Sequence, residues 1–383
     1  MSTFPGPLSE FPGVSVDRFD GENRASSVFF LSHCHTDHMY GLEDLQGLPG
    51  PLFVSEISTV ILRRKFSHLT DVRTLEIGVE TAIDIRGETV HVTTIPAGHC
   101  PGSVMFLFES PGCRVLYTGD FRLREKDVRN VKVFQRIRSN LDCVYVDSTF
   151  LDKGFAEFPS RMDSTNAIVA RIQQWTGTSP NHIVWINTPA RYGSEFLFRE
   201  IHRRTKKSLH IDLDNLSSYC HIPDMDGVFV LDGQQSQVHA CWKPGCSAVR
   251  HQGKEVCEIR PSALFWRNWK TTSCLTKSQS RIFRVCYSSH SSLAELKDFI
   301  GFLKPRKVEL NVVPKSAESR AEMFSVLREI LAGSDAEETP KSAAETTEEI
   351  SFRNIKLSGS SWEEKLSEEF DNEIMCLPKR KKL

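Results

Sequence analysis

The sequence of 383 residues predicts an α/β fold, and three observations support this prediction. Short apolar stretches bounded by Gly, Pro or Asp recur through the first 150 residues, as buried strands do. From about residue 155 to 281, apolar stretches of strand length alternate with stretches of helix length, which is typical of a parallel sheet covered by helices. Hydrophobic residues make up 39% and charged residues 25%, an ordinary composition for a globular protein.

The apolar segments of the first part predict five strands and one helix. The helix is expected at 57–66. The strands are expected at 27–32, 90–95, 104–109, 113–118 and 143–148. In the following part we expect strands at 181–187, 209–213 and 281–287, with a helix at 194–205.

Two helices are predicted after the last of these strands. Ser292 and Glu295 have the spacing of a capping box, and an apolar stripe follows them over residues 293–303. A second helix is expected at 320–331, ended by Gly333.

Residues 334–383 are rich in Ser, Thr, Glu and Lys, so we expect a disordered tail. Within it, a Ser361–Glu364 capping box precedes apolar residues at every fourth position, which predicts a helix at 361–374 that docks on a protein partner or on the body of this protein. The alternative is a packed terminal helix of the domain. These apolar residues are Trp362, Leu366, Phe370 and Ile374. The basic run at 377–383 resembles a nuclear localisation signal and indicates a nuclear protein.

The composition argues against several classes of protein. No run approaches the roughly 18 apolar residues of a membrane span, and the N-terminus lacks the pattern of a secretory signal. Eleven cysteines without a repeating framework indicate an intracellular protein with thiols, some of them on metal. The net charge of −1 gives no bulk attraction to nucleic acid, so any such site must be a local patch.

The strongest chemical signal is the segment Ser-His-Cys-His-Thr-Asp-His at 32–38, directly after a predicted strand. In an extended loop His33 and His35 point the same way, while Asp37 and His38 reach a neighbouring point. Imidazole and carboxylate groups suit Zn²⁺, so the segment predicts two adjacent metal ions. The alternative is a surface cluster of histidines.

Further ligands are needed, because a zinc ion takes about four. His99 projects from a loop rich in Gly and Pro at 96–102, and Asp120 follows a predicted strand. Either residue alone would more often be structural, but together with the first motif they complete a ligand set.

At this point the sequence resembles a known family. The motifs HCHTDH, PAGHCPGS and YTGDFR resemble those of the metallo-β-lactamase fold and, more narrowly, of the β-CASP nucleases of DNA repair. Asp17, Asp147, His239 and His290 match further motifs of that branch. The resemblance runs from about residue 15 to 333 and is weak at 41–88 and 246–258.

The resemblance implies a metallo-β-lactamase αββα sandwich with an inserted β-CASP α/β domain. The expected domains are 1–154 and 284–333 for the sandwich, 155–283 for the insertion and 334–383 for the tail. It also implies that His33, His35 and His99 hold a first zinc ion, with Asp120 shared between two ions.

The second ion, which is zinc, magnesium or manganese, would be held by Asp37, His38 and His290. Asp17 would orient a ligand histidine, and Asp147 would hold the ligand shell or handle protons.

The resemblance further implies a structural zinc ion in the insertion. Its ligands would be His210, His239, Cys241 and a fourth residue, for which Cys246 is favoured and Cys257 competes. A closed site of two histidines and two cysteines would add folding energy. The alternative is that Cys241 and Cys246 are ordinary buried thiols.

Two adjacent ions suit phosphodiester hydrolysis, although the metal motif alone would equally serve β-lactam or thioester hydrolysis. The insertion favours nucleic acid, since the family uses it to form a substrate cleft. The resemblance therefore implies a DNA endonuclease with 5′-3′ exonuclease activity on ends, hairpins and overhangs, acting in non-homologous end joining. Alternatives are a 5′-exonuclease of telomere or crosslink repair, and an RNA-processing nuclease; a non-catalytic scaffold is disfavoured because no ligand is missing.

The expected partners are double-stranded DNA ends with a hairpin, an overhang or a 5′-phosphate. A DNA-dependent protein kinase or a DNA ligase complex would also bind, by resemblance. Ser288 and Ser291, with Ser292, are candidates for binding a 5′-phosphate. The basic candidates for contact with the DNA backbone are Arg203, Arg204, Lys206 and Lys207, together with Arg63, Arg64, Lys65, Arg122 and Arg124.

Overall fold

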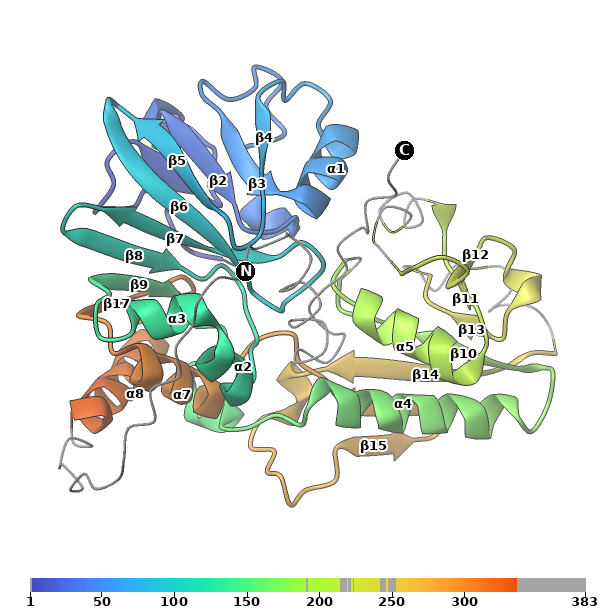
Figure 1. The fold of residues 1–383 in the computed structure, drawn as a ribbon. Coiled ribbons are helices and arrows are strands. Elements are labelled where there is room, and N and C mark those ends of the chain that lie inside the picture. The colour runs from blue at the N-terminus through green and yellow to red at the C-terminus, as the bar shows by residue number, and fades with distance from the viewer. Residues whose placement is uncertain are drawn as a thin grey trace, which may run out of the picture.

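The computed structural model describes residues 2–335, except residue 191 and short gaps at 214–218, 220–221, 223, 242–245 and 247–252. It consists of a body with two facing sheets and a neighbouring unit around a third sheet, on the left and right of Figure 1. The predicted helix at 361–374, the basic run at 377–383 and nearly all of the predicted tail lie outside the described residues.

The first sheet of the body has four parallel strands in the order β1-β2-β3-β4. They are β1 (Val14–Val16), β2 (Val28–Leu31), β3 (Leu52–Ser55) and β4 (Val72–Leu75). Helix α1 (Glu56–Lys65) begins where the Ser55 side chain accepts a hydrogen bond from the Ser58 N–H, a normal N-cap. Its residues Ile61 and Leu62 pack with Phe29 and Leu31 on the outer face of this sheet.

The second sheet has six strands in the order β17-β9-β8-β7-β6-β5. These strands are β5 (Glu80–Ile85), β6 (Glu88–Pro96), β7 (Val104–Ser110), β8 (Cys113–Tyr117), β9 (Cys143–Val146) and β17 (Lys307–Leu310). Strands β5 to β8 are antiparallel, whereas β8, β9 and β17 are parallel. Between the two sheets, Phe30 packs against Phe53 of its own sheet and against Phe106 and Phe108 of the other.

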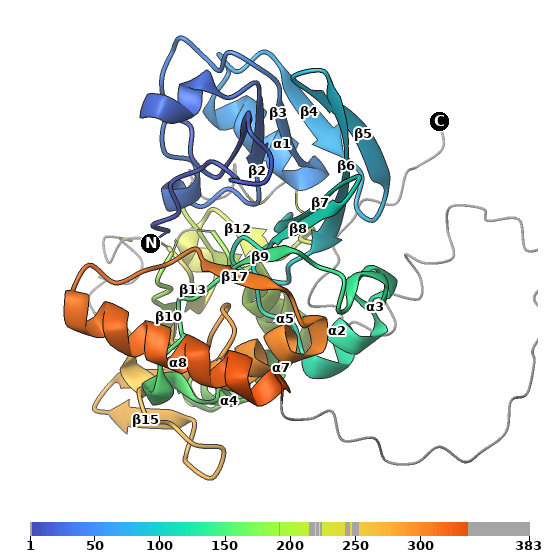
Figure 2. The same ribbon diagram turned by 90° about the vertical axis from the view of Figure 1, so that its left-hand side faces the viewer.

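Four helices cover the outer face of the second sheet: α2 (Glu125–Asn130), α3 (Lys132–Ile137), α7 (Leu293–Leu303) and α8 (Ala317–Asp335). Figure 2 shows α7 and α8 side by side below β17. Phe299 of α7 packs against Phe121 and Phe134. The layers run helix, sheet, sheet, helix, which confirms the predicted αββα sandwich.

The capping box predicted for α7 is present, with both Ser292–Glu295 hydrogen bonds formed. The prediction for α8 was wrong at both ends. The helix begins at Ala317 and includes Gly333, because a helical glycine costs only about 1 kcal/mol relative to alanine.

The third sheet has seven strands in the order β12-β11-β13-β10-β14-β16-β15, all parallel except the edge strand β15. They are β10 (His182–Ile186), β11 (Leu209–His210), β12 (Phe229–Val230), β13 (Val238–His239), β14 (Glu255–Ser262), β15 (Thr276–Gln279) and β16 (Ile282–Cys286). Helices α4 (Arg161–Thr176) and α5 (Glu195–Thr205) pack against it. The mostly parallel sheet with helices outside was predicted, whereas α4 and β14 were not.

Two further details differ from the predicted organisation. The strand expected at 209–213 has only two residues, and β16 crosses the expected domain boundary at 283/284. Among the described residues, no helix is both long and apolar enough to cross a membrane.

Candidate metal centre

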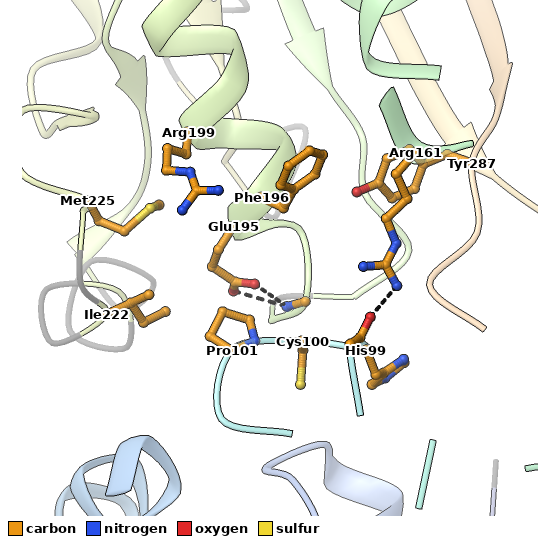
Figure 3. Close-up of a pocket in the computed structure, with 12 residues that line it drawn as sticks. His99, Cys100, Pro101, Arg161, Glu195, Phe196, Arg199, Ile222, Met225 and Tyr287 are labelled. Carbon is orange, nitrogen blue, oxygen red and sulfur yellow. Dashed lines mark hydrogen bonds between the residues drawn. The ribbon is translucent and has the colours of Figure 1, made fainter. Parts of the chain in front are cut away.

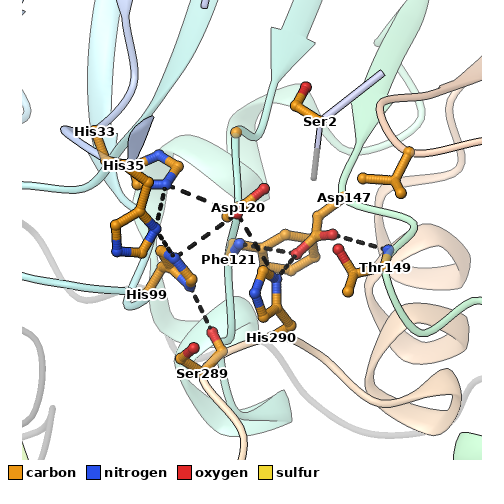
Figure 4. A network of polar contacts seen from close by, with 12 residues as sticks. Ser2, His33, His35, His99, Asp120, Phe121, Asp147, Thr149, Ser289 and His290 are labelled. Carbon is orange, nitrogen blue, oxygen red and sulfur yellow. Dashed lines mark hydrogen bonds and ion pairs between the residues drawn. The ribbon is translucent and has the colours of Figure 1, made fainter. Parts of the chain in front are cut away.

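Strand ends from both sheets of the body bring the predicted ligands together at one edge. Asp17 follows β1, His33 and His35 follow β2, His99 follows β6 and Asp120 follows β8. Asp147 follows β9, and His290 comes after β16 of the third sheet. Figure 4 shows His33, His35, His99, Asp147 and His290 gathered around Asp120.

The first group of donor atoms consists of three histidines and Asp120, all within 4.8 Å of one another. The Nδ1 atom of His35 lies 3.0 Å from His33 Nε2 and 3.1 Å from His99 Nε2. Asp120 Oδ2 lies 3.7 Å from each of those Nε2 atoms. Burial lowers the pKa of His33 and His99 well below the usual value, so both rings are neutral, the form that binds metals. This donor set fits a tetrahedral divalent ion.

A second set of donor atoms lies on the other oxygen of Asp120. His38 Nε2 is 3.4 Å from Asp120 Oδ1 and 3.9 Å from Asp37 Oδ2. Although it is buried, His38 Nε2 has no hydrogen-bond partner. Burial lowers the pKa of His38, but the Asp120 and Asp17 carboxylates outweigh it and raise the pKa well above its usual value. The same two carboxylates that favour a proton on His38 would favour a second cation in its place, with the ring then neutral and Nε2 as a ligand.

His290 lies on a different side of Asp120 from that pair. Its Nδ1 is 2.8 Å from Asp147 Oδ2 and 3.9 Å from Asp120 Oδ2. Backbone N–H groups of Phe121 and Thr149 donate to Asp147 and hold its carboxylate in place. The structure therefore groups His290 with Asp120 and Asp147, not with Asp37 and His38 as expected.

Asp17 fixes the direction of two histidine rings. Its carboxylate accepts from the Ser32 N–H at 2.7 Å, the Ser32 hydroxyl at 2.6 Å and the Tyr117 hydroxyl at 3.0 Å. His38 Nδ1 lies 2.8 Å from Asp17, and His33 Nδ1 lies 2.9 Å from the Ser32 hydroxyl. With both Nδ1 atoms donating, the Nε2 atoms of both rings are directed toward Asp120. Asp17 adopts a left-handed φ of 54°, a strained backbone that favours Gly.

The expected cluster in the third-sheet unit is also assembled. The donor atoms of His210, His239, Cys241 and Cys246 all lie within 4.8 Å of one another. His210 Nδ1 is 3.0 Å from both His239 Nδ1 and Cys241 Sγ, and 3.4 Å from Cys246 Sγ. Both Nε2 atoms contact backbone carbonyls, of Leu231 and Ser236, which orients Nδ1 toward the sulfurs. Cys257 lies on β14 and is not part of this cluster.

A cleft of about 280 Å³ lies over the metal-ligand candidates. His35, Asp37, His99, Asp120 and His290 line one side. The other side is formed by the end of β14 and by the segments that follow β10 and β14 of the third-sheet unit, including Ser262, Tyr192 and Leu264. The cleft therefore lies between the two-sheet body and the third-sheet unit.

The predicted phosphate contacts are only partly in this cleft. Ser288 lines it, but its hydroxyl donates to the His290 carbonyl. Ser291 is buried and donates to the Phe121 carbonyl, and Ser292 caps α7. Ser289 and Thr149 line the cleft instead, a placement that no motif indicated.

The predicted basic contacts lie elsewhere. Arg203 and Arg204 pair with Glu200 near the end of α5, and Lys207 donates to Gln237. Over the described residues, neither these three nor Lys206 lines the cleft. The prediction for Arg122 was wrong, because its side chain is buried and bonds Glu295, Ser288 and Pro159.

Other residues at the site carried no sequence signal. The Ser2 N–H donates to Asp37 at 2.9 Å, and the Tyr192 carbonyl lies 2.8 Å from His35 Nε2. Both contacts join positions far apart in the sequence, so only the folded chain reveals them.

A sandwich of two sheets between helices, with histidines and aspartates gathered at its strand ends, defines the metallo-β-lactamase class. Two family models match the chain: "Beta-lactamase superfamily domain" over residues 18–183 and "DNA repair metallo-beta-lactamase" over residues 223–316. Over these two ranges the chain is similar to the DNA-repair branch of the metallo-β-lactamase family.

Similar proteins include artemis of Mus musculus, with 34% identity over 347 residues, 82% of this chain and 49% of that protein. Artemis of Danio rerio has 34% identity over 368 residues, which cover 85% of this chain and 56% of that protein. The 5′ exonuclease Apollo of Mus musculus has 30% identity over 308 residues, covering 77% and 52%. The chain thus spans about half the length of these relatives.

A solved structure has the same fold. It is a protein of unknown function from Enterococcus faecalis V583, with a TM-score of 0.51, 14% identity, and coverage of 75% of this chain and 79% of that chain.

Proposed function

We propose that this protein is a metal-dependent DNA nuclease that hydrolyses phosphodiester bonds at DNA ends, hairpins and overhangs. It acts as an endonuclease with 5′-3′ exonuclease activity in double-strand break repair by non-homologous end joining. One observation carries the proposal: neutral His33, His35 and His99 converge with Asp120 at a cleft between the body and the third-sheet unit. The similarity to artemis and to the DNA-repair family model supports DNA as the substrate.

Zinc is the proposed metal of the first group, because three neutral imidazoles and one carboxylate are a ligand set that zinc prefers. Zinc, magnesium or manganese would be held beside Asp37 and His38. Such ions supply positive charge for a phosphate in the transition state and lower the pKa of water.

The chain's own residues hold and orient these parts. Asp120 places one oxygen toward each set of histidines, and Asp17 fixes the ring of His38. Asp147 holds the His290 ring at Nδ1, from which a proton can pass to the carboxylate. Ser289 and Thr149 line the cleft beside His290 and offer hydroxyl groups to phosphate oxygens.

A cleavage assay with the purified full chain tests the proposal. Hairpin, 5′-overhang and blunt duplex DNA, each with a 5′-phosphate or a 5′-hydroxyl, are incubated separately with Zn²⁺, Mg²⁺ or Mn²⁺. RNA of the same sequences serves as the substrate control. We expect cleavage of DNA hairpins and overhangs, and a loss of at least about 100-fold in Asp120→Asn, which retains its fold.

Asp120→Asn with an unchanged thermal midpoint is the matched control for contaminating nucleases. Absence of DNA cleavage in every metal, or equal rates for Asp120→Asn and the unaltered chain, would refute the proposal. Activity confined to 5′-phosphorylated ends would favour a 5′-exonuclease like Apollo, and faster cleavage of RNA would favour RNA processing.

Binding to a DNA-dependent protein kinase or a DNA ligase complex stays a prediction, as do the DNA contacts of Arg203, Arg204, Lys206 and Lys207.

A further inference from the structure

A buried arginine of the third-sheet unit reaches two loops of the metal centre. Arg161 is the first residue of α4, whose N-cap is Ser160, and its side chain is buried. Its Nη2 donates to the carbonyl oxygen of Gly98 and, at 3.4 Å, to that of Ser289. Its Nε donates to the Ser288 carbonyl at 3.4 Å. Figure 3 shows the guanidinium directed at the backbone beside His99.

Two of the carbonyls that Arg161 contacts belong to residues directly before histidines of the candidate metal centre. Gly98 directly precedes His99, and Ser289 directly precedes His290. The guanidinium therefore holds the peptide unit in front of each of two histidines at the metal centre. The Ser289 carbonyl also lies 2.9 Å from His99 Nδ1, so the two loops share this contact.

The loop before His99 needs such a restraint. Gly98 adopts a φ of 66°, a conformation open to glycine, and no side chain limits its rotation. Buried hydrogen bonds to a charged donor are strong, because water does not compete for the carbonyl oxygens. One close contact to Gly98 and two longer ones of 3.4 Å to Ser288 and Ser289 come from one planar group and so reach both loops, which the single ammonium of lysine cannot reproduce.

A second arginine supports the same loop from the body. Arg122 donates to the Ser288 carbonyl at 3.0 Å and to Pro159 at 2.9 Å, and it pairs with Glu295. Arg122 donates to neither Gly98 nor Ser289 in the described contacts, so it does not connect the two histidine loops.

We propose that Arg161 is a positioning residue of the metal centre. Its guanidinium fixes His99 and His290 relative to each other around Asp120, and it ties their loops to α4 of the third-sheet unit. The proposal rests on the metal centre described under the proposed function, but it does not require that the substrate be DNA.

Metal affinity measures this role directly. The full chain and its variants are stripped of metal and titrated with Co²⁺ against a competing chelator. The absorption of the cobalt ion reports the ligand geometry, and sulfur charge-transfer bands separate the cysteine-containing cluster from the histidine centre. The variants are Arg161→Gln, Arg161→Lys, Arg161→Gly and Arg122→Lys. Arg136→Lys is the matched control, because Arg136 lies on α3 and pairs with Glu109.

We expect Arg161→Gln and Arg161→Lys to weaken Co²⁺ binding at the histidine centre by about 10- to 100-fold and to alter its spectrum. Arg136→Lys should change neither the Co²⁺ affinity nor the spectrum. Arg122→Lys should weaken Co²⁺ binding less than the Arg161 variants do. Added guanidinium should restore Co²⁺ affinity in Arg161→Gly, since it refills the position of the lost group.

Unchanged affinity and spectrum in folded Arg161 variants would overturn the proposal. If Arg161→Lys and Arg161→Gln both fail to fold, Arg161 serves stability alone and the proposal is equally overturned. Altered Co²⁺ binding in the variants, with no DNA cleavage by the unaltered chain, would leave Arg161 as a positioning residue and refute the nuclease function instead.

Discussion

Asp120 and Glu195 are both buried carboxyl groups, and their surroundings give them opposite properties. Burial raises the pKa of Asp120, but His38 and His290 outweigh it, and the pKa lies well below its usual value. Burial also raises the pKa of Glu195, to about 7. Hydrogen bonds from the backbone N–H groups of Gly193 and Glu195 itself lower this pKa, but they do not outweigh burial. Asp120 is thus charged at neutral pH, as a ligand candidate should be, whereas Glu195 is close to half protonated.

Glu195 makes a specific prediction about pH. An unfolded glutamate has a pKa of about 4.3, so the folded chain retains a proton that the unfolded chain releases between about pH 4.3 and 7. The free energy of unfolding therefore falls as the pH rises through this window. Glu195→Gln cannot titrate, so its free energy of unfolding should not fall in this window. The difference in unfolding free energy, Glu195→Gln minus the unaltered chain, should therefore be about 2–4 kcal/mol larger at pH 8 than at pH 5.

Urea unfolding of both proteins at pH 5 and pH 8 measures this difference. Gln retains an acceptor for the Gly193 N–H, so a general loss of packing is not expected. A constant stability difference at the two pH values would contradict the assigned pKa.

At the scale of elements, the short strands β11 and β13 carry the second ligand cluster. Each has two residues, and they pair with each other at His210 and His239. Strands of this length gain little from their ladder hydrogen bonds, so a bound ion would add much of the local stability. Cys241 and Cys246 come from the chain after β13 and close the cluster on one side.

Cys241→Ser should lower bound zinc by about one equivalent and reduce the unfolding midpoint by at least about 5 °C. Cys257→Ser is the control, because Cys257 is also a buried cysteine and lies outside the cluster on β14, which β10 separates from β13. Metal content by mass spectrometry and a thermal melt measure both effects. Equal zinc content in Cys241→Ser and the unaltered chain would show that Cys241 is only a core thiol.

At the scale of the whole molecule, the cleft depends on two units meeting. The body supplies His35, Asp37, His99 and Asp120, while loops after β10 and β14 supply the opposite wall. Hydrogen bonds from Arg161 to the Gly98 carbonyl and from His35 Nε2 to the Tyr192 carbonyl cross between them. A change in the position of the third-sheet unit would therefore act on the metal centre as well as on the cleft.

The chain also has a predicted nuclear localisation signal at 377–383, outside the described residues. Deleting residues 378–383 from a fluorescent fusion should lower the ratio of nuclear to cytoplasmic fluorescence, because the cluster of four basic residues is removed. Deleting six residues at 340–345 is the control for tail length. An unchanged ratio after the first deletion would contradict the nuclear signal.

Local sequence was sufficient to predict most of the ligand candidates of the metal centre. Four ligand candidates lie within residues 33–38 after a buried strand, so their proximity follows from chain connectivity alone. His99 and Asp120 also follow predicted strands, but only the structure shows that β6 and β8 run in the same direction, so that both residues lie at one edge. The capping box at Ser292 was readable for the same reason, since its two partners lie three residues apart.

The tertiary structure alone decided the contacts between distant segments. It placed His290 against Asp147, which is 143 residues away, and selected Cys246 over Cys257 for the second cluster. It also buried Arg122 with Glu295 and directed Arg161 at the loops of His99 and His290. A basic residue in a sequence has the same charge wherever it folds, and only the packing around it decides whether it meets solvent, DNA or a backbone carbonyl.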